Sequence, residues 1–293
     1  MNTTAPRSPS VPSPTQLLEI ATTAASAAAE YIRGLDRDGL AREYKTSSHD
    51  IVTEHDRASE DIIVSELRRL LPSARIVGEE GGERPAQEPA PGAEGPQVSF
   101  YVDPIDGTSN FAAGLPLFCV SIGVSIGDDL VAGVIDAPIL GQVFAAADGE
   151  ATLNGRPLTP RSTRPAADAL VLSGFPGQRV GNEFPEFAAR AQRALENGVS
   201  SVRHLGTAAL ELAYVAAGWA DATSLATINS WDVTAGFHIL RRAGGSIRTW
   251  PGTGGIEQAD HLQPAYVACT GQERLTVLDE LHEELQELRN ATL

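Results

Sequence analysis

Residues 103–111 read Asp-Pro-Ile-Asp-Gly-Thr-Ser-Asn-Phe, and this stretch is the most informative in the chain. The apolar run 98–102 precedes it and predicts a strand that delivers Asp103 at its carboxyl end. Pro104 stiffens the turn, so that the carboxylates of Asp103 and Asp106 can point into one space. An acid-capped turn is the ordinary alternative for Asp-x-x-Asp-Gly taken alone.

Gly107 and Thr108, which come next, stand where a helix could begin with free backbone N–H groups facing outward. Two carboxylates beside such a helix start can hold a hard cation and a phosphate group together. The stretch therefore predicts a cation and phosphate site, provided that other segments supply further ligands.

Three other segments place acidic residues at the ends of predicted elements. Glu79 follows the apolar run 75–78, and Asp232 lies in the first turn of a predicted helix. Asp50 and Asp56 flank a further strand-to-helix junction. Each of these residues alone could be a helix cap. Together they supply the oxygen ligands that Mg²⁺ prefers and that a two-metal site requires.

The rest of the chain alternates between helical and strand patterns. Helices, the first capped by Thr15, are predicted at 15–33, 56–71, 183–196, 207–217, 231–243 and 272–289. Strands are predicted at 74–78, 98–102, 118–126, 130–135, 142–146, 169–172, 199–203 and 267–269. A stretch dense in Pro, Gly and Glu, 81–97, predicts a mobile loop. Elements in this order indicate a layered α/β protein whose halves meet near Gly155.

Composition and charge exclude several classes of protein. The chain has 293 residues, of which 42% are hydrophobic, enough for a core in one large domain or two. Its formal net charge of −16 argues against nucleic acid as a partner. No apolar run approaches the ~20 residues that span a bilayer, so we expect no membrane segment. The glycine-rich motifs of nucleotide-binding loops are missing from the sequence.

The N-terminal segment 1–14 is rich in Ser, Thr and Pro and lacks the apolar stretch of a secretory signal. We interpret it as the disordered leader of a cytoplasmic protein. In that compartment Cys119 and Cys269 are expected to be buried free thiols rather than a disulfide.

Taken together, the segments resemble the inositol monophosphatase family, the lithium-sensitive magnesium phosphomonoesterases. The matching pieces occur in family order at 50–56, 78–80, 103–111, 206–209, 231–236 and 244–245. The resemblance implies a mixed α+β sandwich with layers α-β-α-β-α, formed by one phosphatase unit over 15–293. A metal-binding α+β half, 15–155, and an α/β half, 156–293, would enclose the site. It also implies a homodimer.

The resemblance assigns metal ligands residue by residue. Glu79, Asp103 and the backbone carbonyl of Ile105 would hold one Mg²⁺. Asp103, Asp106 and Asp232 would hold a second, and Asp232 would also face the substrate. Two or three ions per site are expected.

The same resemblance assigns the phosphate and the attacking water. The N–H groups of Gly107 and Thr108 would hold phosphate oxygens. Asp56 and Thr108 would form a pair that activates water together with Glu79 and the first metal. Lys45, the only lysine of the chain, falls where the family has a lysine near the phosphate or an outer metal.

One position departs from the family. Inositol phosphatases usually carry an acidic residue seven positions before the Asp of the Trp-Asp motif, and this chain has Leu225 there. A polyol hydroxyl against Leu225 would be left unpaired, at about 1–3 kcal/mol. The pocket therefore suits a nucleoside or modified-sugar monophosphate. A nearby carboxylate, such as Asp221, could instead replace the missing one.

Two other functions stay open. A nucleoside 3′,5′-bisphosphate phosphatase is the nearest relative, but that group tends to carry a basic residue where this chain has Ser109. A non-catalytic protein that binds metal or phosphate on the same fold is the other alternative. The complete acidic set argues against it, because decayed enzymes usually lose a ligand.

Overall fold

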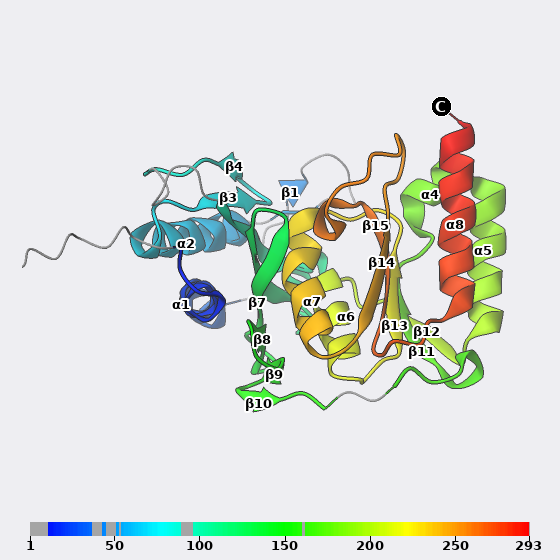
Figure 1. Cartoon of the computed structure of the whole chain (residues 1–293), viewed down its shortest axis with the longest axis horizontal. Coiled ribbons are helices and arrows are strands. Elements are labelled where there is room, and N and C mark those ends of the chain that lie inside the picture. The colour runs from blue at the N-terminus through cyan, green and yellow to red at the C-terminus, as the bar shows by residue number, and fades with distance from the viewer. Residues whose placement is uncertain are drawn as a thin grey trace, which may run out of the picture.

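Helices and sheets alternate in five layers across the longest axis of the molecule (Figure 1). The computed structural model describes residues 11–36, 43–44, 51–52, 54–88, 96–159 and 162–292. Two helices form the first layer, an eight-stranded sheet the second, two helices the third, a five-stranded sheet the fourth and further helices the fifth. The predicted α-β-α-β-α fold is therefore confirmed.

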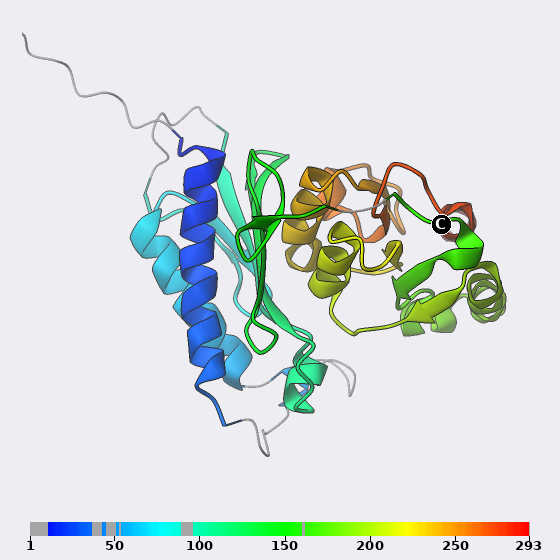
Figure 2. The same cartoon turned by 90° about the horizontal axis from the view of Figure 1, so that it is seen from below.

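The first sheet is largely antiparallel and runs in the order β10-β9-β8-β7-β6-β5-β3-β4. Its strands are β3 (Arg75–Gly78), β4 (Gly82–Arg84), β5 (Val98–Asp106), β6 (Cys119–Ile126), β7 (Asp129–Ala137), β8 (Gln142–Ala146), β9 (Thr152–Leu153) and β10 (Arg156–Pro157). Helices α1 (Pro14–Arg33) and α2 (Glu54–Leu70), blue and cyan in Figure 2, pack side by side against its outer face. The helix α1 buries Leu17 and Ile32 with the alanines between them, the 3.6-residue stripe of a core-facing helix.

Helices α6 (Ala208–Ala216) and α7 (Ser230–Arg242) fill the layer between the two sheets. Glycines let α7 approach the first sheet closely. A Cβ at Gly123 would lie 2.3 Å from Cγ2 of Thr234, and one at Gly133 would lie 2.7 Å from the carbonyl oxygen of Ala235. This close packing fixes the start of α7, and with it Asp232, relative to the first sheet.

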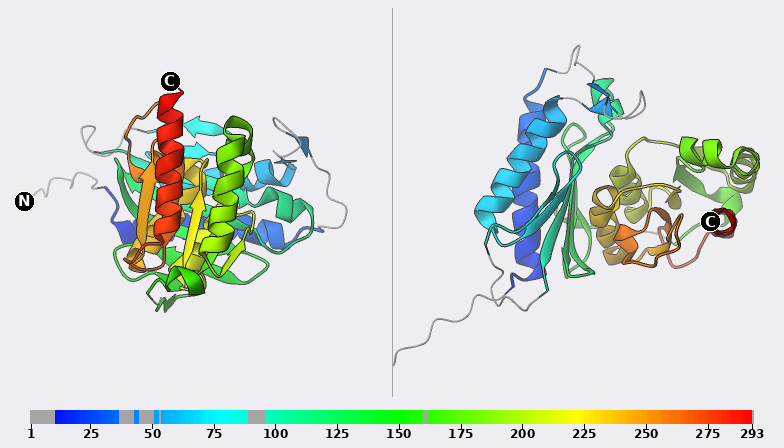
Figure 3. Two further views of the ribbon diagram at one scale, coloured as in Figure 1. Left: turned by 90° about the vertical axis from the view of Figure 1, so that its right-hand side faces the viewer. Right: turned by 90° about the horizontal axis from the view of Figure 1, so that it is seen from above.

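The second sheet has the order β12-β11-β13-β15-β14, in which β11 is parallel to both of its neighbours. Its strands are β11 (Leu170–Ser173), β12 (Ser201–Arg203), β13 (Ala222–Leu225), β14 (Ser246–Trp250) and β15 (Ala265–Cys269). Helices α5 (Pro185–Gly198) and α8 (Thr276–Ala291) cover its outer face (Figure 3, left). The short elements are β1 (Glu43–Tyr44), β2 (Ile51–Val52), α3 (Thr108–Ala112), α4 (Gly177–Glu183) and two 3₁₀ turns.

Several details differ from the sequence prediction, among them the strands β13 and β14, which were not predicted. The first helix is capped by Ser13 rather than Thr15, in a capping box with Gln16. The helix predicted over 183–196 begins at Pro185 and runs to Gly198, and a separate short helix that was not predicted, α4, ends at Glu183 before it. Part of the predicted mobile loop 81–97 is the strand β4, paired antiparallel with β3, and 89–95 lies outside the described residues.

The cysteines, the candidate membrane spans and the boundary between the two sheets were also addressed by the sequence prediction. Cys119 and Cys269 are buried free thiols, as predicted. Across the described ranges, no helix has the length and apolar character needed to cross a bilayer. The first sheet ends at Pro157 and the second begins at Leu170, while the division near Gly155 stays a prediction.

Candidate metal and phosphate site

The ends of two parallel strands bring the first pair of acidic residues together. Strands β3 and β5 are parallel neighbours, and Gly78 pairs with Val102 at their carboxyl ends. The N–H of Glu79 donates to the carbonyl oxygen of Val102 at 3.1 Å. Glu79 therefore follows the end of β3 beside Asp103, whereas Asp103 itself lies inside β5, which continues to Asp106 beyond the predicted end at 102.

Three of the predicted carboxylates converge near these strand ends. Oxygen atoms of Asp103, Asp106 and Asp232 all lie within 4.8 Å of one another. The pairing of β5 with β6 is interrupted between Asp103 and Asp106, and the N–H of Ile105 donates to Oδ1 of Asp103 at 3.0 Å. Asp232 arrives from the first turn of α7, where its carboxylate accepts the N–H of Asn229 at 3.0 Å.

Burial and mutual repulsion hold protons on this acidic cluster. Burial, followed by the neighbouring charge of Glu79, raises the pKa of Asp103 well above its usual range. Burial and the charge of Asp232 raise the pKa of Asp106 to about 8. Burial and Glu79 raise the pKa of Asp232 to about 6. Within the described ranges, no basic side chain forms an ion pair with these three aspartates, so the donor set fits a hard divalent cation.

The start of α6 fixes one oxygen of Asp106. The hydroxyl of Thr207 donates to Oδ2 of Asp106 at 2.6 Å, and the N–H of Ala209 donates to the same oxygen at 2.7 Å. The helix N-terminus favours this negative charge, and the other oxygen is left for a ligand. The sequence alone did not predict this contact of Thr207.

Asp56 and Thr108 form the predicted pair. Asp56 is fully buried near the start of α2, and the Thr108 hydroxyl donates to its Oδ1 at 2.9 Å. The same hydroxyl lies 3.2 Å from the carbonyl oxygen of Ile105. The structure thus links α2 to the end of β5 through Thr108. The roles of this pair and of the metal ligands stay predictions.

Gly107 occupies the tight corner between β5 and α3. Its φ of +96° lies in the region that favours glycine. An added Cβ would lie 3.0 Å from the carbonyl oxygen of Leu117 and 3.3 Å from Cβ of Thr207. Only glycine therefore lets the backbone turn here between the acidic cluster and α6.

Glu60 is a functional residue that sequence reasoning missed. Its side chain is buried and accepts the N–H groups of Glu80 and Gly81, each at 2.8 Å. It also pairs with Arg84 of β4 at 2.8 Å. Glu60 thereby holds the turn that carries Glu79. It lies one helical turn after Asp56, a spacing that could have revealed the shared inward face.

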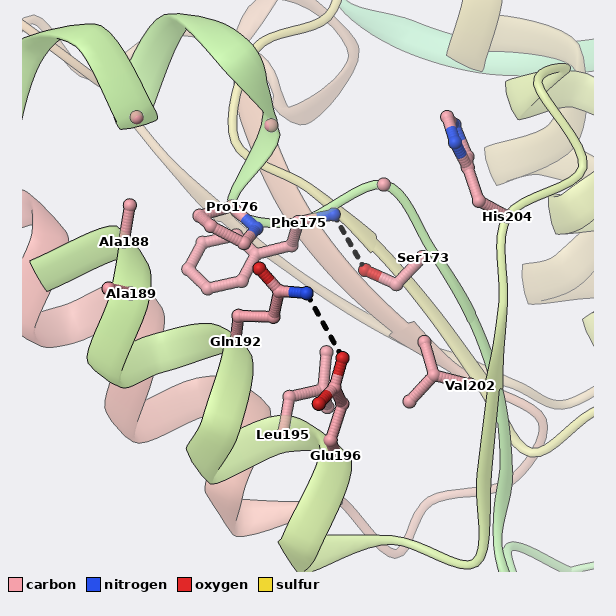
Figure 4. A pocket seen from close by; sticks show the side chains of 13 residues that line it. Ser173, Phe175, Pro176, Ala188, Ala189, Gln192, Leu195, Glu196, Val202 and His204 are labelled. Carbon is pink, nitrogen blue, oxygen red and sulfur yellow. Dashed lines mark hydrogen bonds between the residues drawn. The ribbon is translucent and has the colours of Figure 1, made fainter. Parts of the chain in front are cut away.

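The second half also contains a cavity of about 520 Å³ beside the end of β11, lined by none of the acidic residues described above (Figure 4). Gly174, Phe175, Gln192 and His204 are among its lining residues. A Cβ at Gly174 would lie 2.8 Å from Nε2 of His204 and 3.1 Å from Cδ2 of Leu225. Leu225 therefore adjoins this cavity through Gly174.

Asp221 does not take the place of the missing acidic residue. It is buried just before β13, at the end of the strand opposite to Leu225. Its carboxylate accepts the Arg164 guanidinium and the N–H of Leu170 at 2.5–3.0 Å. Lys45 and Asp50 lie outside the described residues.

Comparisons with known proteins show the family of this chain. The model of the inositol monophosphatase family matches residues 13–291. The chain is 34% identical to "Nus factor SuhB" of Pseudomonas aeruginosa, over 86% of this chain and 92% of that protein. It is 37% identical to an inositol-1-monophosphatase of Synechocystis, over 80% and 78%. An inositol monophosphatase structure from Anabaena superposes with a TM-score of 0.71 and 32% identity, over 93% and 96% of the two chains.

Proposed function

The chain belongs to the inositol monophosphatase family, and from that premise we propose that it is a magnesium-dependent phosphatase of a small phosphate monoester. One observation carries the proposal. The carboxylates of Asp103, Asp106 and Asp232 meet within 4.8 Å. Beside them, the Thr108 hydroxyl is bonded to buried Asp56 at 2.9 Å.

Five groups would hold the two or three ions, namely the side chains of Glu79, Asp103, Asp106 and Asp232 and the carbonyl oxygen of Ile105. Bound Mg²⁺ supplies a nucleophilic water near neutral pH and neutralises the charge of the phosphate group. The clustered carboxylates favour a cation here, because without one their negative charges repel one another.

The chain's own residues would position the reacting groups. The N–H groups of Gly107 and Thr108 would hold two phosphate oxygens for in-line attack. The Thr108 hydroxyl donates to Asp56, so its lone pairs are free to accept a proton from the attacking water. As Thr108 takes a proton from the water, its own hydroxyl proton would pass along this hydrogen bond to the Asp56 carboxylate, which accepts it. We also propose that the charge of Lys45, a residue outside the described ranges, contributes to phosphate binding.

For the substrate, we propose a nucleoside or modified-sugar monophosphate rather than inositol phosphate. The apolar side chain of Leu225 adjoins the cavity, and the carboxylate of Asp221 is held by Arg164 at the far end of the strand. A polyol would therefore lose a hydrogen-bond acceptor at this position. A homodimer and a cytoplasmic location likewise stay predictions.

A non-catalytic role is the second candidate, since relatives named "Nus factor SuhB" are about as similar as those named inositol-1-monophosphatase. The acidic cluster and the Asp56–Thr108 pair favour catalysis. A screen of phosphate release separates the two. Inositol, sugar, histidinol and nucleoside monophosphates would be tested with Mg²⁺ and with a chelator. We expect release only with Mg²⁺, and no release from any ester would favour the non-catalytic role.

A further inference from the structure

Arg289, near the end of α8, is a buried cation that forms no ion pair with any carboxylate among the described residues. Its side chain is 5% exposed, and its Nη2 donates to the carbonyl oxygen of Ala226 at 3.1 Å. Its Nε is buried and has no hydrogen-bond partner, and within the described residues no carboxylate lies at ion-pair distance. Buried guanidinium groups are normally paired, because an isolated charge is costly to remove from water.

A second arginine shares a small cavity with Arg289. The cavity has a volume of about 150 Å³ and is lined by Arg289, by Arg179 of α4, and by Thr227, Gly252 and Thr253 among others. It lies where β13 and β14 end. Its volume is that of about five water molecules, and a cavity of this size is too small for a nucleotide.

The wall of the cavity is held in place by α8 itself. The side-chain amide of Gln286 accepts the N–H of Gly252 at 2.9 Å and donates to its carbonyl oxygen at 2.8 Å. Gln286 lies three residues before Arg289, so the same helix fixes the loop and presents the guanidinium. Gly252 itself has a φ of +67° and packs against Pro264.

The charges around the cavity sum to a positive value. Arg179 is two-thirds exposed and pairs with Glu183 at 3.0 Å. Burial lowers the pKa of Arg289, while the charge of Glu183 raises it and that of Arg179 lowers it. Two guanidinium groups therefore face one carboxylate, which is already bonded to Arg179. A positive pocket is unusual in a chain with a net charge of −16.

We propose that this cavity binds a small oxyanion of the inorganic phosphate class, held between the guanidinium groups of Arg179 and Arg289. Planar guanidinium groups match the oxygens of phosphate in bidentate geometry, and two threonines at the rim add hydroxyl groups. The site is independent of the proposed phosphatase activity. Arg289 donates to the carbonyl oxygen of Ala226, the residue that follows Leu225. The proposed anion site therefore lies next to the end of β13.

The test measures thermal unfolding of the full chain in a chelator, so that phosphate cannot bind through metal at the acidic cluster. Phosphate is compared with chloride at equal ionic strength. We expect phosphate at ten times its dissociation constant to raise Tm by about 3 °C. Arg179→Gln should lose most of this rise. The matched control is Arg193→Gln, which removes an exposed arginine of α5 that does not line the cavity and should keep it.

A second variant, Arg289→Met, tests the role of the buried guanidinium directly. Without phosphate its Tm should equal or exceed that of the wild type, because the substitution removes an unpaired buried charge. With phosphate the wild type should gain and the variant should not. If Arg289→Met does not fold, Arg179→Gln decides alone. Equal phosphate shifts in wild type and Arg179→Gln, or no shift in the wild type, would overturn the proposal and leave a cavity filled by water.

Discussion

Two pairs of parallel strands, β3–β5 in the first sheet and β11–β13 in the second, present side chains of different polarity at their carboxyl ends. In the first sheet, Glu79 follows β3, and Asp103 lies near the end of β5. In the second, β11 and β13 end at Ser173 and Leu225, and Gly174 follows. The first pair gathers negative charge, whereas the second presents small and apolar groups.

The hydrogen bonding of the two ends differs in the same way. The Ser173 hydroxyl donates to the carbonyl oxygen of Ser224 at 2.8 Å and also accepts the N–H of Phe175 at 3.0 Å. That end is thus satisfied within the protein. The acidic end keeps protons or needs a cation, as the raised pKa values of its aspartates indicate. We propose that the acidic end, completed by Asp232 from the second half, carries the chemistry, and that the end of β13 selects the substrate.

The largest expected effect is at the acidic end. Asp103→Asn should lower turnover on the order of 10³-fold at saturating Mg²⁺, because it removes a charge proposed to bridge two cations. The measurement is the rate of phosphate release from the best substrate of the screen. The matched control is Asp136→Asn, a buried aspartate of β7 in the same sheet, which should stay active. An Asp103→Asn variant with more than a tenth of wild-type turnover would refute the two-metal assignment.

The second effect tests the link between α2 and β5. Asp56→Asn and Thr108→Ala should each lower kcat by ~10²-fold with little change in KM, as expected when proton handling is lost. Because the two groups act through one hydrogen bond, the double variant should be about as slow as the slower single variant. Multiplied losses would show that the residues act independently and that the pair is misassigned.

Removing the metal should make the stability of the protein depend on pH, because the carboxylates of the acidic cluster then repel one another. A carboxyl group whose pKa is raised by folding binds a proton that the unfolded chain has released. The metal-free protein should therefore lose stability as pH rises from about 4 through the pKa of about 8 of Asp106. Tm measured between pH 5 and pH 8 in a chelator should fall, and saturating Mg²⁺ should flatten the curve. Identical slopes with and without Mg²⁺ would contradict a cation site at this cluster.

Most of the acidic site could be predicted from the sequence, because the patterns that predict its strands and acidic residues are local. The apolar runs before Glu79 and Asp103 predicted two strands, although the second continues through Asp103 to Asp106, and the parallel pairing of these strands places the acidic residues together. The strand β13 was missed because Ala-Thr-Ser-Leu shows no alternation and little bulk. Glu60 was missed because a glutamate on a helix usually faces solvent, and only the tertiary contact with the Glu80–Gly81 turn buries it.

The smallest expected effect is at Leu225, at the apolar end of β13. Leu225→Glu would add a carboxylate to the end of β13 and so restore an acceptor for polyol hydroxyls. A recovered hydrogen bond of about 1–3 kcal/mol corresponds to a change of roughly tenfold in specificity. We therefore expect the ratio of kcat/KM for inositol 1-phosphate to that for a nucleoside 5′-monophosphate to rise about tenfold.

The control for this substitution is Leu225→Met, which keeps an apolar side chain of similar volume and should leave that ratio unchanged. Both variants need a stability measurement, since Leu225 packs partly against the core and a glutamate there loses apolar contacts. The decisive result comes from the wild type. If inositol 1-phosphate proves to be its best substrate by kcat/KM, the apolar end of β13 does not select against polyols. The site must then satisfy their hydroxyls with groups other than the side chain at position 225.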